Sequence, residues 1–576
     1  MTLAWCGAAR ADEVVNLGRL ALIQPLLERL QISQIIDRHL PPDPQLEFSH
    51  GRVLSLLLAA RLCQPLALMN VPDWAERSGA EFLWDIPADK LNDDRLGRAL
   101  DAFFQQRHSI LASVTAEVLQ FTGLKLERLH FDTTHLVMYG AYASSRPRPA
   151  TALSELRGDG QLPPAHIGHG YLTDAHMIQV GLTAIVDEQG ALPVFHQCLD
   201  GSRHGRRAIQ EQVELLSQHL PLPPELLMVS DRGTFSAAHV ARLHRHGHFV
   251  VCSMNWGDYR AMYDEHAAQL HWQKASFLSL EQQRRRQHHS SLPHEHYRIA
   301  VLKHTLTGTT TKEAVPGRLI FVHSSADEKG SRQRRTENIA KIKAGLEEIA
   351  ARVQRGNARC TPAAVQRAVA RLFGKRAAAR YFRWELLPLT PAEKAALPPA
   401  APHCRQPSYR FAFSFDQAAA TADEKYDGIF VLFTTAPMHR YSADTVFTYF
   451  KQQPFLELLH HQSKTPLAVR PVFLKSPYRV EALVGLMQIA LQVYQTLERR
   501  YRQTVTADAS PLERRTTAET LLRAFNIYGV FVTHACVGRV VFATRLTSRQ
   551  RAILDQLSLP TPARMLRGKL QPDPSG

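Results

Sequence analysis

Residues 177–201, MIQVGLTAIVDEQGALPVFHQCLDG, hold two apolar runs on either side of Asp-Glu-Gln-Gly. Two such runs around a turn-forming centre predict a β-hairpin. Upstream, residues 128–142 (RLHFDTTHLVMYGAY) predict another strand, and downstream, residues 205–256 predict helix, strand, helix and strand in turn. The order from residue 128 to residue 256 is therefore β-β-β-α-β-α-β, which is typical of a mixed α/β sheet.

The segments around this core differ in pattern. Residues 1–125 carry apolar residues at three- and four-residue spacing, which predicts a helical N-terminal domain. Residues 257–420 contain strand-like and basic helical segments, and we interpret them as an insertion between two parts of the core, residues 126–256 and 421–505. Residues 506–576 predict a helix, a hairpin, a second helix and a tail.

The composition narrows the class of protein. The chain has 576 residues, of which 45% are hydrophobic and 21% charged, so a disordered chain is excluded. At about 150 residues per domain, this length predicts three or four domains. The formal net charge is +16, which favours polyanionic partners and makes nucleic acid the first candidate.

Cysteines and apolar stretches indicate the compartment. The seven cysteines form no Cys-x-x-Cys pair, so neither a disulfide framework nor a cysteine zinc site is indicated. The most apolar stretches, residues 53–63 and 482–491, are shorter than the roughly 20 residues that cross a bilayer. Residues 1–13 carry acidic side chains where a signal peptide would be apolar. We therefore expect a cytoplasmic protein.

Two aspartates occupy strand positions. Asp132 lies inside the apolar strand HFDTT, and Asp231 ends the strand MVSDRG. A charge at the edge of a buried strand is costly unless it is paired, hydrogen-bonded or bound to a metal. Each carboxylate therefore belongs either to a turn or to a functional site, and these two positions alone leave both interpretations open.

A third carboxylate and a lysine lie in residues 449–464, YFKQQPFLELLHHQSK. Glu457 and Lys464 are seven residues apart, and at about 100° per residue they lie within about 20° of one helix face. Pro454 favours a helix that begins near that residue. The two charges could serve a metal ion and a phosphate, or could form an ordinary solvated pair.

Other charged segments have competing interpretations. Asp427 in YDGIFVL is a rival third carboxylate, although Asp-Gly before a strand favours a turn. The histidines of residues 287–297 (QHHSSLPHEHY) could bind a metal, but the neighbouring arginines favour a solvated loop. Residues 332–345 and 370–383 are basic, and the net charge favours contact with the DNA backbone over solvated helix faces.

Four motifs surround these positions: HFDTT (130–134), VSDRGTFS (229–236), YFKQQPFLELLHHQSK (449–464) and VRPVFLKSPYRVEAL (469–483). In combination they resemble the DDE transposases of bacterial insertion sequences, in the subgroup with a Tyr-Arg-Glu-Lys signature. The similarity covers most of the chain. Gln453 stands at the arginine position of that signature, and Tyr449 lies one residue further from Glu457 than the usual spacing.

This resemblance implies an RNase H-like α/β fold, with a mixed five-stranded sheet, flanking helices, an α+β insertion domain and a helical N-terminal domain. It places Asp132 on the first strand, Asp231 after the fourth and Glu457 on a later helix. It also implies that these three carboxylates are the catalytic residues and that they hold two Mg²⁺ or Mn²⁺ ions.

The implied activity is metal-dependent excision and strand transfer, which is cut-and-paste transposition by phosphoryl transfer. The implied partners are the terminal inverted repeats of the element and target DNA, bound by a homodimer near the bacterial nucleoid. Lys464, Arg470 and Tyr449 are the implied DNA contacts. The helical N-terminal domain is the implied reader of the inverted repeats.

Two other functions stay open at this point. A carboxylate cluster could hydrolyse a glycoside, but a basic protein suits an anionic substrate better. A transposase-derived protein that has lost catalysis would still bind DNA. All three carboxylates are present, which favours an intact enzyme.

Overall fold

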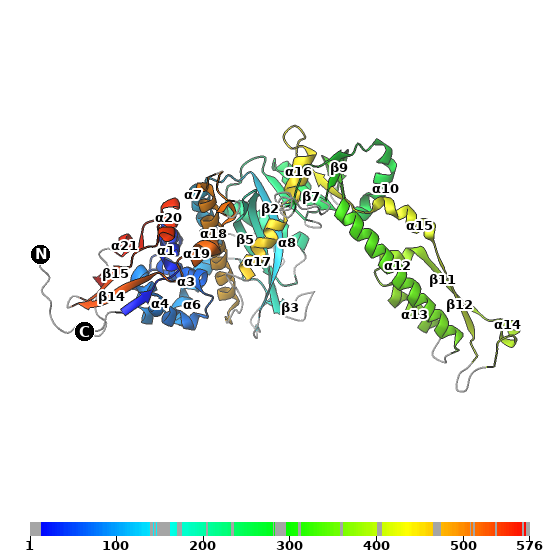
Figure 1. Ribbon diagram of the computed structural model, residues 1–576, viewed down its shortest axis with the longest axis horizontal. Coiled ribbons are helices and arrows are strands. Elements are labelled where there is room, and N and C mark those ends of the chain that lie inside the picture. Colours follow the sequence, from blue (N-terminus) through cyan, green and yellow to red (C-terminus); the bar gives the residue numbers. More distant parts are fainter. Residues whose placement is uncertain are drawn as a thin grey trace.

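The computed structural model describes most of the chain: residues 13–138, 142, 146, 162–169, 176–202, 205–231, 235–279, 282, 295–308, 313–356, 361–399, 406–464, 474–506, 508–510, 513–535, 538–566 and 570–571. Figure 1 shows an elongated molecule with a helical region at one end, a large sheet in the middle and a projecting arm at the other end.

The helical region contains the seven helices that follow residue 19. They are α1 (Leu20–Arg29), α2 (Ile32–His39), α3 (His50–Cys63), α4 (Val71–Ser78), α5 (Ala80–Trp84), α6 (Asp93–Gln105) and α7 (Arg107–Thr122). Helix α3 is apolar on almost every side and is buried, and Ser49 caps it by accepting a hydrogen bond from the backbone N–H of Arg52. The long helix α18 (Pro477–Thr504) packs against α3, α6 and α7, so the helical region and the later part of the chain share one core.

The central sheet has ten strands. They are β2 (Arg128–Val137), β3 (Gly168–His169), β4 (His176–Asp187), β5 (Gly190–Asp200), β6 (Leu227–Ser230), β7 (Phe249–Met254), β8 (Gln273–Lys274), β9 (Tyr297–Thr307), β10 (Ala314–Ser324) and β13 (Ile429–Thr434). Neighbouring strands follow the order β3-β4-β2-β6-β7-β13-β10-β9-β8, and β5 also pairs with β4. Strands β2, β6 and β7 run parallel, and the other pairs are antiparallel.

The predicted order β-β-β-α-β-α-β is confirmed, except that the two-residue strand β3 was not predicted. The hairpin predicted at residues 177–201 is β4–β5, closed by the pair Asp187 and Gly190. The helices of this part are α8 (Gly205–His219), α9 (Ala237–Arg245), α10 (Trp256–His266), α16 (Ala443–Phe450) and α17 (Pro454–Lys464). Helix α17 begins at Pro454, as predicted.

The prediction of a five-stranded sheet was wrong, because the sheet continues past β7. Strand β13 pairs with β7, and β10, β9 and β8 then extend the sheet by antiparallel pairing. The segment predicted as an insertion, residues 257–420, therefore divides in space. Its residues 273–324 contribute three strands to the central sheet, and its later part forms the arm.

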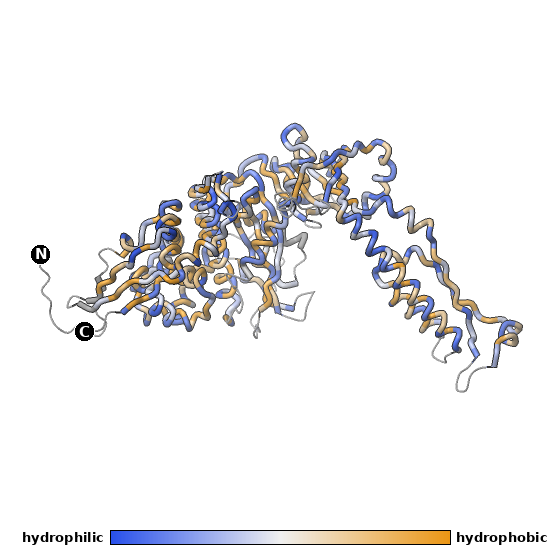
Figure 2. Tube along the Cα trace, viewed as in Figure 1, coloured by the Kyte–Doolittle hydropathy of each residue, from blue (hydrophilic) through white to orange (hydrophobic). Residues whose placement is uncertain are grey.

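The arm projects from the end of the sheet (Figure 1). It consists of α12 (Ser325–Gln354), α13 (Pro362–Phe373), β11 (Phe382–Pro388), α14 (Pro391–Ala395), β12 (Tyr409–Phe415) and α15 (Gln417–Ala422). Helix α12 buries a single stripe, Ile342, Leu346, Ile349 and Val353, against α13 and the β11–β12 pair. In Figure 2 hydrophobic and hydrophilic residues alternate along the arm helices, as expected for one buried stripe.

A second sheet joins the first and last parts of the described chain. Strand β1 (Glu13–Asn16) pairs with β14 (Gly529–Ala535), which continues through β15 (Gly538–Ala543) to β16 (Leu570–Gln571). Helices α19 (Ala518–Arg523), α20 (Ser548–Gln556) and α21 (Pro562–Met565) lie in the same C-terminal segment. The C-terminal hairpin was predicted, and its pairing with β1 was not.

Within the described residues, no single helix is long and apolar enough to cross a membrane. One pair of segments bent by 92°, His50–Cys63 with Leu68–Ser78, meets the same length and composition criteria when taken together.

Candidate active site

The parallel strands β2, β6 and β7 bring two of the predicted carboxylates together. Phe131 pairs with Ser230, and Ser230 pairs with Cys252. The next position along each strand therefore holds Asp132, Asp231 and Ser253, side by side on strands about 4.8 Å apart. The Ser253 hydroxyl donates a hydrogen bond to Oδ1 of Asp231 at 3.2 Å, which confirms this continuation of the register.

The two aspartates share one face of the sheet. Leu129 and Phe131 belong to the core on the opposite face, so alternation turns His130 and Asp132 toward α16 and α17. Val229 and Val251 pack in the core that contains Val446 and Phe447 of α16, so Asp231 also faces this helical layer.

Gln453, in the turn before α17, fastens that helix to β2. Its Nε2 donates to the backbone carbonyl of Phe131 at 2.9 Å, and its Oε1 lies 2.9 Å from Nδ1 of His130. Because the amide oxygen can only accept, Nδ1 of His130 carries the proton. Burial lowers the pKa of His130 to about 3, so the ring is neutral near pH 7.

Helix α17, which carries Glu457, packs against the same strand. Gln453, Glu457 and His460 are four and three residues apart, which puts them on one helix face. Nε2 of His460 lies 3.3 Å from Oδ2 of Asp132, so this face points toward the aspartates. Glu457 itself is exposed.

The carboxylates remain open to solvent. The side chain of Asp132 is 30% exposed, and its Oδ1 accepts a hydrogen bond from the backbone N–H of Thr133 at 2.8 Å. Asp231 is exposed. The described part of the chain contains no group of three or more His, Cys, Asp or Glu side chains that is already arranged to hold a metal ion. The structure thus brings Asp132 and Asp231 together, with Glu457 on the covering helix but outside a closed cluster.

The predicted DNA contacts occupy different places. Tyr449 on α16 lies under Arg128, with the guanidinium carbon 3.6 Å from the ring centroid. Arg128 begins β2 and is four residues, or about 13 Å, from Asp132, so Tyr449 is not beside the carboxylates. Lys464 is the last residue of α17, and Arg470 lies outside the described residues. His288, His289 and His294 are also outside them.

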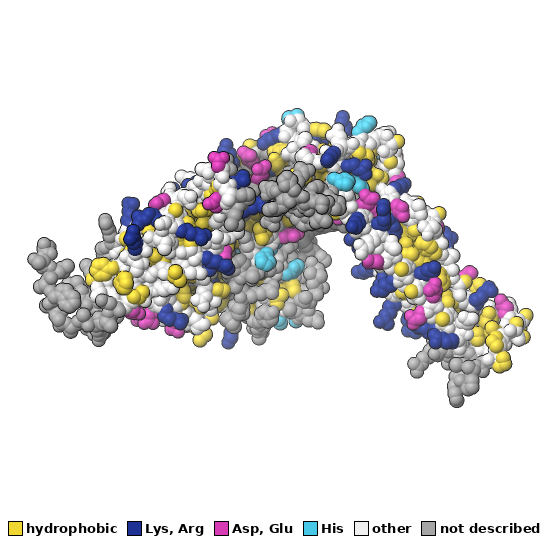
Figure 3. Space-filling model, viewed as in Figure 1, with side chains coloured by type: hydrophobic (Ala, Val, Ile, Leu, Met, Phe, Trp, Pro, Cys, Tyr) yellow, Lys and Arg dark blue, Asp and Glu magenta, His cyan; other side chains and the backbone are white. Residues whose placement is uncertain are grey.

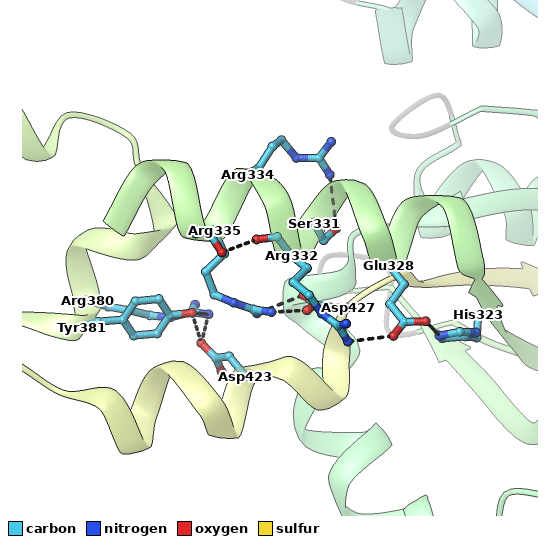
Figure 4. Close-up of polar contacts among 11 residues, drawn as sticks. His323, Glu328, Ser331, Arg332, Arg334, Arg335, Arg380, Tyr381, Asp423 and Asp427 are labelled. Carbon is cyan, nitrogen blue, oxygen red and sulfur yellow. Dashed lines mark hydrogen bonds and ion pairs between the residues drawn. The ribbon is translucent and has the colours of Figure 1, made fainter. Parts of the chain in front are cut away.

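Asp427, the rival third carboxylate, belongs to the base of the arm. Nη1 of Arg335 donates to its Oδ1 at 3.0 Å, and Nη2 of the same arginine contacts its Oδ2 (Figure 4). Nearby, Asp423 accepts a hydrogen bond from Tyr381 at 2.6 Å and pairs with Arg260 and Arg380. Both carboxylates are 7% exposed, so they join the arm to the sheet and are not open to a substrate.

Sequence reasoning missed three residues of this site. Ser253 and His460 contact the aspartates, and His130 is held by Gln453. The spacing Glu457-Leu-Leu-His460 places the histidine one helical turn from the predicted glutamate, and that signal could have identified it. Ser253 gave no comparable signal, because its place depends on the pairing of β6 with β7.

The arm carries a basic surface. Figure 3 shows Lys and Arg side chains gathered along it. The exposed basic residues of α12, α13 and the residues directly after each helix are Lys329, Arg332, Arg334, Lys341, Lys343, Arg352, Arg355, Arg367, Arg371 and Lys375. They include members of both basic stretches noted in the sequence.

The N-terminal part of the chain matches a known protein family. Residues 12–116 match a family described as a domain of unknown function, DUF4277. No curated protein matches the chain in sequence. One similar solved structure is the cryo-EM structure of a piggyBac transposase synaptic complex with hairpin DNA, with 8% identity and a TM-score of 0.33 over 98% of this chain and 89% of that one. A TM-score of 0.33 is too low to show a common fold.

Proposed function

We propose that the protein is a DNA transposase with an RNase H-like core, which excises an insertion sequence and joins it to target DNA. The observation that carries this proposal is the matched register of Asp132 and Asp231 on adjacent parallel strands, under the helix that bears Glu457. The strand order β5-β4-β2-β6-β7, with only β2, β6 and β7 parallel, is the arrangement expected of such a core.

The donor set fits Mg²⁺ or Mn²⁺ in chemical kind. Carboxylate oxygens are the ligands that these hard cations prefer, and both aspartates are accessible to solvent. We propose that Asp132 and Asp231 hold two ions, with Glu457 as the third ligand. When bound, such ions activate the attacking oxygen and stabilise the leaving oxygen of an in-line phosphoryl displacement.

The neighbouring side chains position these carboxylates. Ser253 orients Asp231 through its hydroxyl, and Gln453 fixes the start of α17 against the carbonyl of Phe131, one residue before Asp132. The hydrogen bond from Gln453 holds the start of α17 against β2 and so limits how far Glu457 can lie from Asp132. A site made of three carboxylates needs such a fixed spacing between its ligands.

DNA is the proposed partner. The net charge of +16 and the basic surface of the arm suit a phosphate backbone. Lys464, seven residues after Glu457, is the proposed phosphate contact beside the carboxylates, and Arg470 and Tyr449 are further proposed contacts. Synapsis of two inverted repeats would require a homodimer on DNA, which also binds the target.

A second candidate is a transposase-derived protein that binds DNA without cleaving it. The observation that favours it is the lack of a closed three-ligand group in the described residues, together with His460 beside Asp132. The two candidates share DNA binding and differ in catalysis.

The test is Mg²⁺-dependent excision from a plasmid that carries the ends of the element. Asp132→Ala, Asp231→Ala and Glu457→Ala are expected to abolish excision while DNA binding persists. Glu265→Ala, which removes an exposed carboxylate of α10, is the matched control and is expected to keep both. Wild-type binding without excision, in Mg²⁺ and in Mn²⁺, would establish the non-catalytic candidate instead.

A further inference from the structure

A buried arginine lies in the helical region without an ion-pair partner among the described residues. Arg61, in the last turn of α3, is 5% exposed. Its Nε makes no hydrogen bond, and no ion pair engages its guanidinium within the described part of the chain. Burial lowers its pKa to about 10, so it still carries its charge near neutral pH. A buried charge without a counter-charge is unfavourable, which indicates that an anion belongs beside it.

Arg61 lines a cleft of about 370 Å³. The cleft lies between the end of α3, the short helix Leu68–Asn70 that follows it, and the start of α18. Two further basic side chains, Lys475 and Arg479, line the same cleft, and Asp93 is the single carboxylate among its described lining residues. Basic groups therefore outnumber acidic ones around this space.

The start of α18 faces the cleft. Ser476 and Arg479 both line it, and Ser476 does not cap the helix with its side chain. Pro477 has no N–H, and the N–H groups of Tyr478 and Arg479 lie in the first turn, where a helix offers them no acceptor. A helix of 28 residues also presents the positive end of its dipole at this point.

Arg479 is held in place before any ligand arrives. Its Nε and Nη2 donate to the carboxylate of Asp101 at 2.9 and 2.7 Å. Its Nη1 lies over Gly97, where a Cβ atom would come within 2.4 Å, so only glycine leaves room for this arrangement. Because Asp101 already neutralises Arg479, Arg61 and Lys475 face only the carboxylate of Asp93 in this lining, and the cleft keeps a net positive charge.

We propose that this cleft binds a phosphate group, either of the DNA backbone or of a free phosphate compound. A tetrahedral oxyanion can accept hydrogen bonds from a guanidinium, an ammonium and helix N–H groups at the same time. The site lies apart from Asp132, Asp231 and Glu457 in its lining residues, and it does not depend on the proposed catalysis.

The test measures thermal unfolding of the full chain with inorganic phosphate and with chloride at the same ionic strength. We expect phosphate to raise the wild-type melting temperature by about 2 °C. Arg61→Met keeps the apolar stem, and it should remove this rise while leaving the protein without phosphate equally stable or more stable. Lys475→Met changes an exposed residue, and it should weaken phosphate binding about tenfold without affecting folding.

Arg77→Gln, an exposed arginine of α4 outside the cleft, is the matched control and should respond to phosphate as the wild type does. The absence of a phosphate-specific rise in the wild type would overturn the proposal. An unchanged response in both Arg61→Met and Lys475→Met would overturn it as well.

A short DNA duplex distinguishes the two sources of phosphate. If the DNA backbone is the source, Arg61→Met and Lys475→Met should each weaken duplex binding about tenfold relative to Arg77→Gln. If a free phosphate compound is the source, duplex binding stays unchanged while stabilisation by phosphate is lost. Either result supports the phosphate site, and excision is not needed to read it.

Discussion

Two pairs of aspartates occupy opposite situations in this molecule. Asp423 and Asp427, at the base of the arm, are buried, and arginine side chains contact both. Asp132, within β2, and Asp231, directly after β6, are open to solvent, and among their contacts are His460, Ser253 and backbone. The first pair uses its charge to join two parts of the chain, whereas the second pair lies where solvent reaches it.

The largest effect is expected at the open pair. Asp231→Asn removes a charge but keeps the hydrogen bond with Ser253. If the proposed function holds, excision should fall about a thousand-fold, since metal assistance contributes about 4 kcal/mol to such a step. Stability should change by less than about 0.5 kcal/mol, because the side chain is exposed. Excision rates and a melting curve measure these two effects. A large loss of stability in Asp231→Asn would contradict the view that this aspartate, unlike those of the arm, does not hold the fold together.

The next effect is expected at the arm. Asp427→Ala leaves Arg335, whose side chain is 12% exposed, without its counter-charge. We expect the free energy of unfolding to fall by about 3 kcal/mol, and proteolysis at the base of the arm to accelerate. The double variant Asp427→Ala with Arg335→Met should recover part of this loss, because it removes both charges. Equal losses in the single and double variants would show that the pair is not coupled.

Acid should weaken the sheet before the arm. The folded pKa of His130 is about 3, below its ordinary value of 6.5. Between these values the unfolded chain binds a proton that the folded protein does not, so stability falls as the pH drops below about 6.5. At pH 5 this amounts to about 2 kcal/mol, and His130→Gln should remove it. Denaturant unfolding at pH 7 and pH 5 measures the difference, with exposed His439→Gln as control.

The Asp423 carboxylate at the base of the arm should respond at lower pH. Burial opposes ionisation of Asp423, but hydrogen bonds from Tyr381 and Arg260 keep its pKa below the ordinary value of 3.8. The contribution of ionised Asp423 to the stability of the fold is present above pH 3.8. It is lost as the pH falls through the lower pKa that Asp423 has in the folded protein. Hydrogen exchange at pH 5 should therefore show faster opening around β2 than at the base of the arm. Faster opening at the base of the arm would contradict the prediction that His130 responds to acid before Asp423 does.

The smallest effect is expected at Ser253. Ser253→Ala removes one solvent-accessible hydrogen bond to Asp231, so stability should fall by about 0.5 kcal/mol. If Ser253 only orients the carboxylate, excision should slow by a few-fold and not be lost. A loss as large as that of Asp231→Asn would assign Ser253 a direct role in the reaction.

The sequence predicted those features that depend on neighbouring residues. The hairpin at 177–201 and the start of α17 at Pro454 follow from local turn and helix signals. The extent of the sheet was not predictable in this way, because β10 pairs with β13, about 100 residues later. Local patterns carry no information on such a pairing.

The same limit applies to the candidate site. The motifs identified Asp132, Asp231 and Glu457, but the face that each side chain occupies depends on strand register and helix packing. The role of Asp427 could not be inferred either, since Arg335 precedes it by 92 residues. Whether the three carboxylates close around a metal stays a prediction.

The pairing of β1 with β14 has a consequence for the synthesis of the protein. The partner of Val15 is Val530, so the ribosome must add more than 500 residues before β1 has a strand to pair with. At about 5–20 residues per second, the edge of β1 stays open for roughly half a minute or longer. An open strand edge invites aggregation, so we expect the nascent chain to need chaperone protection until its last sheet forms.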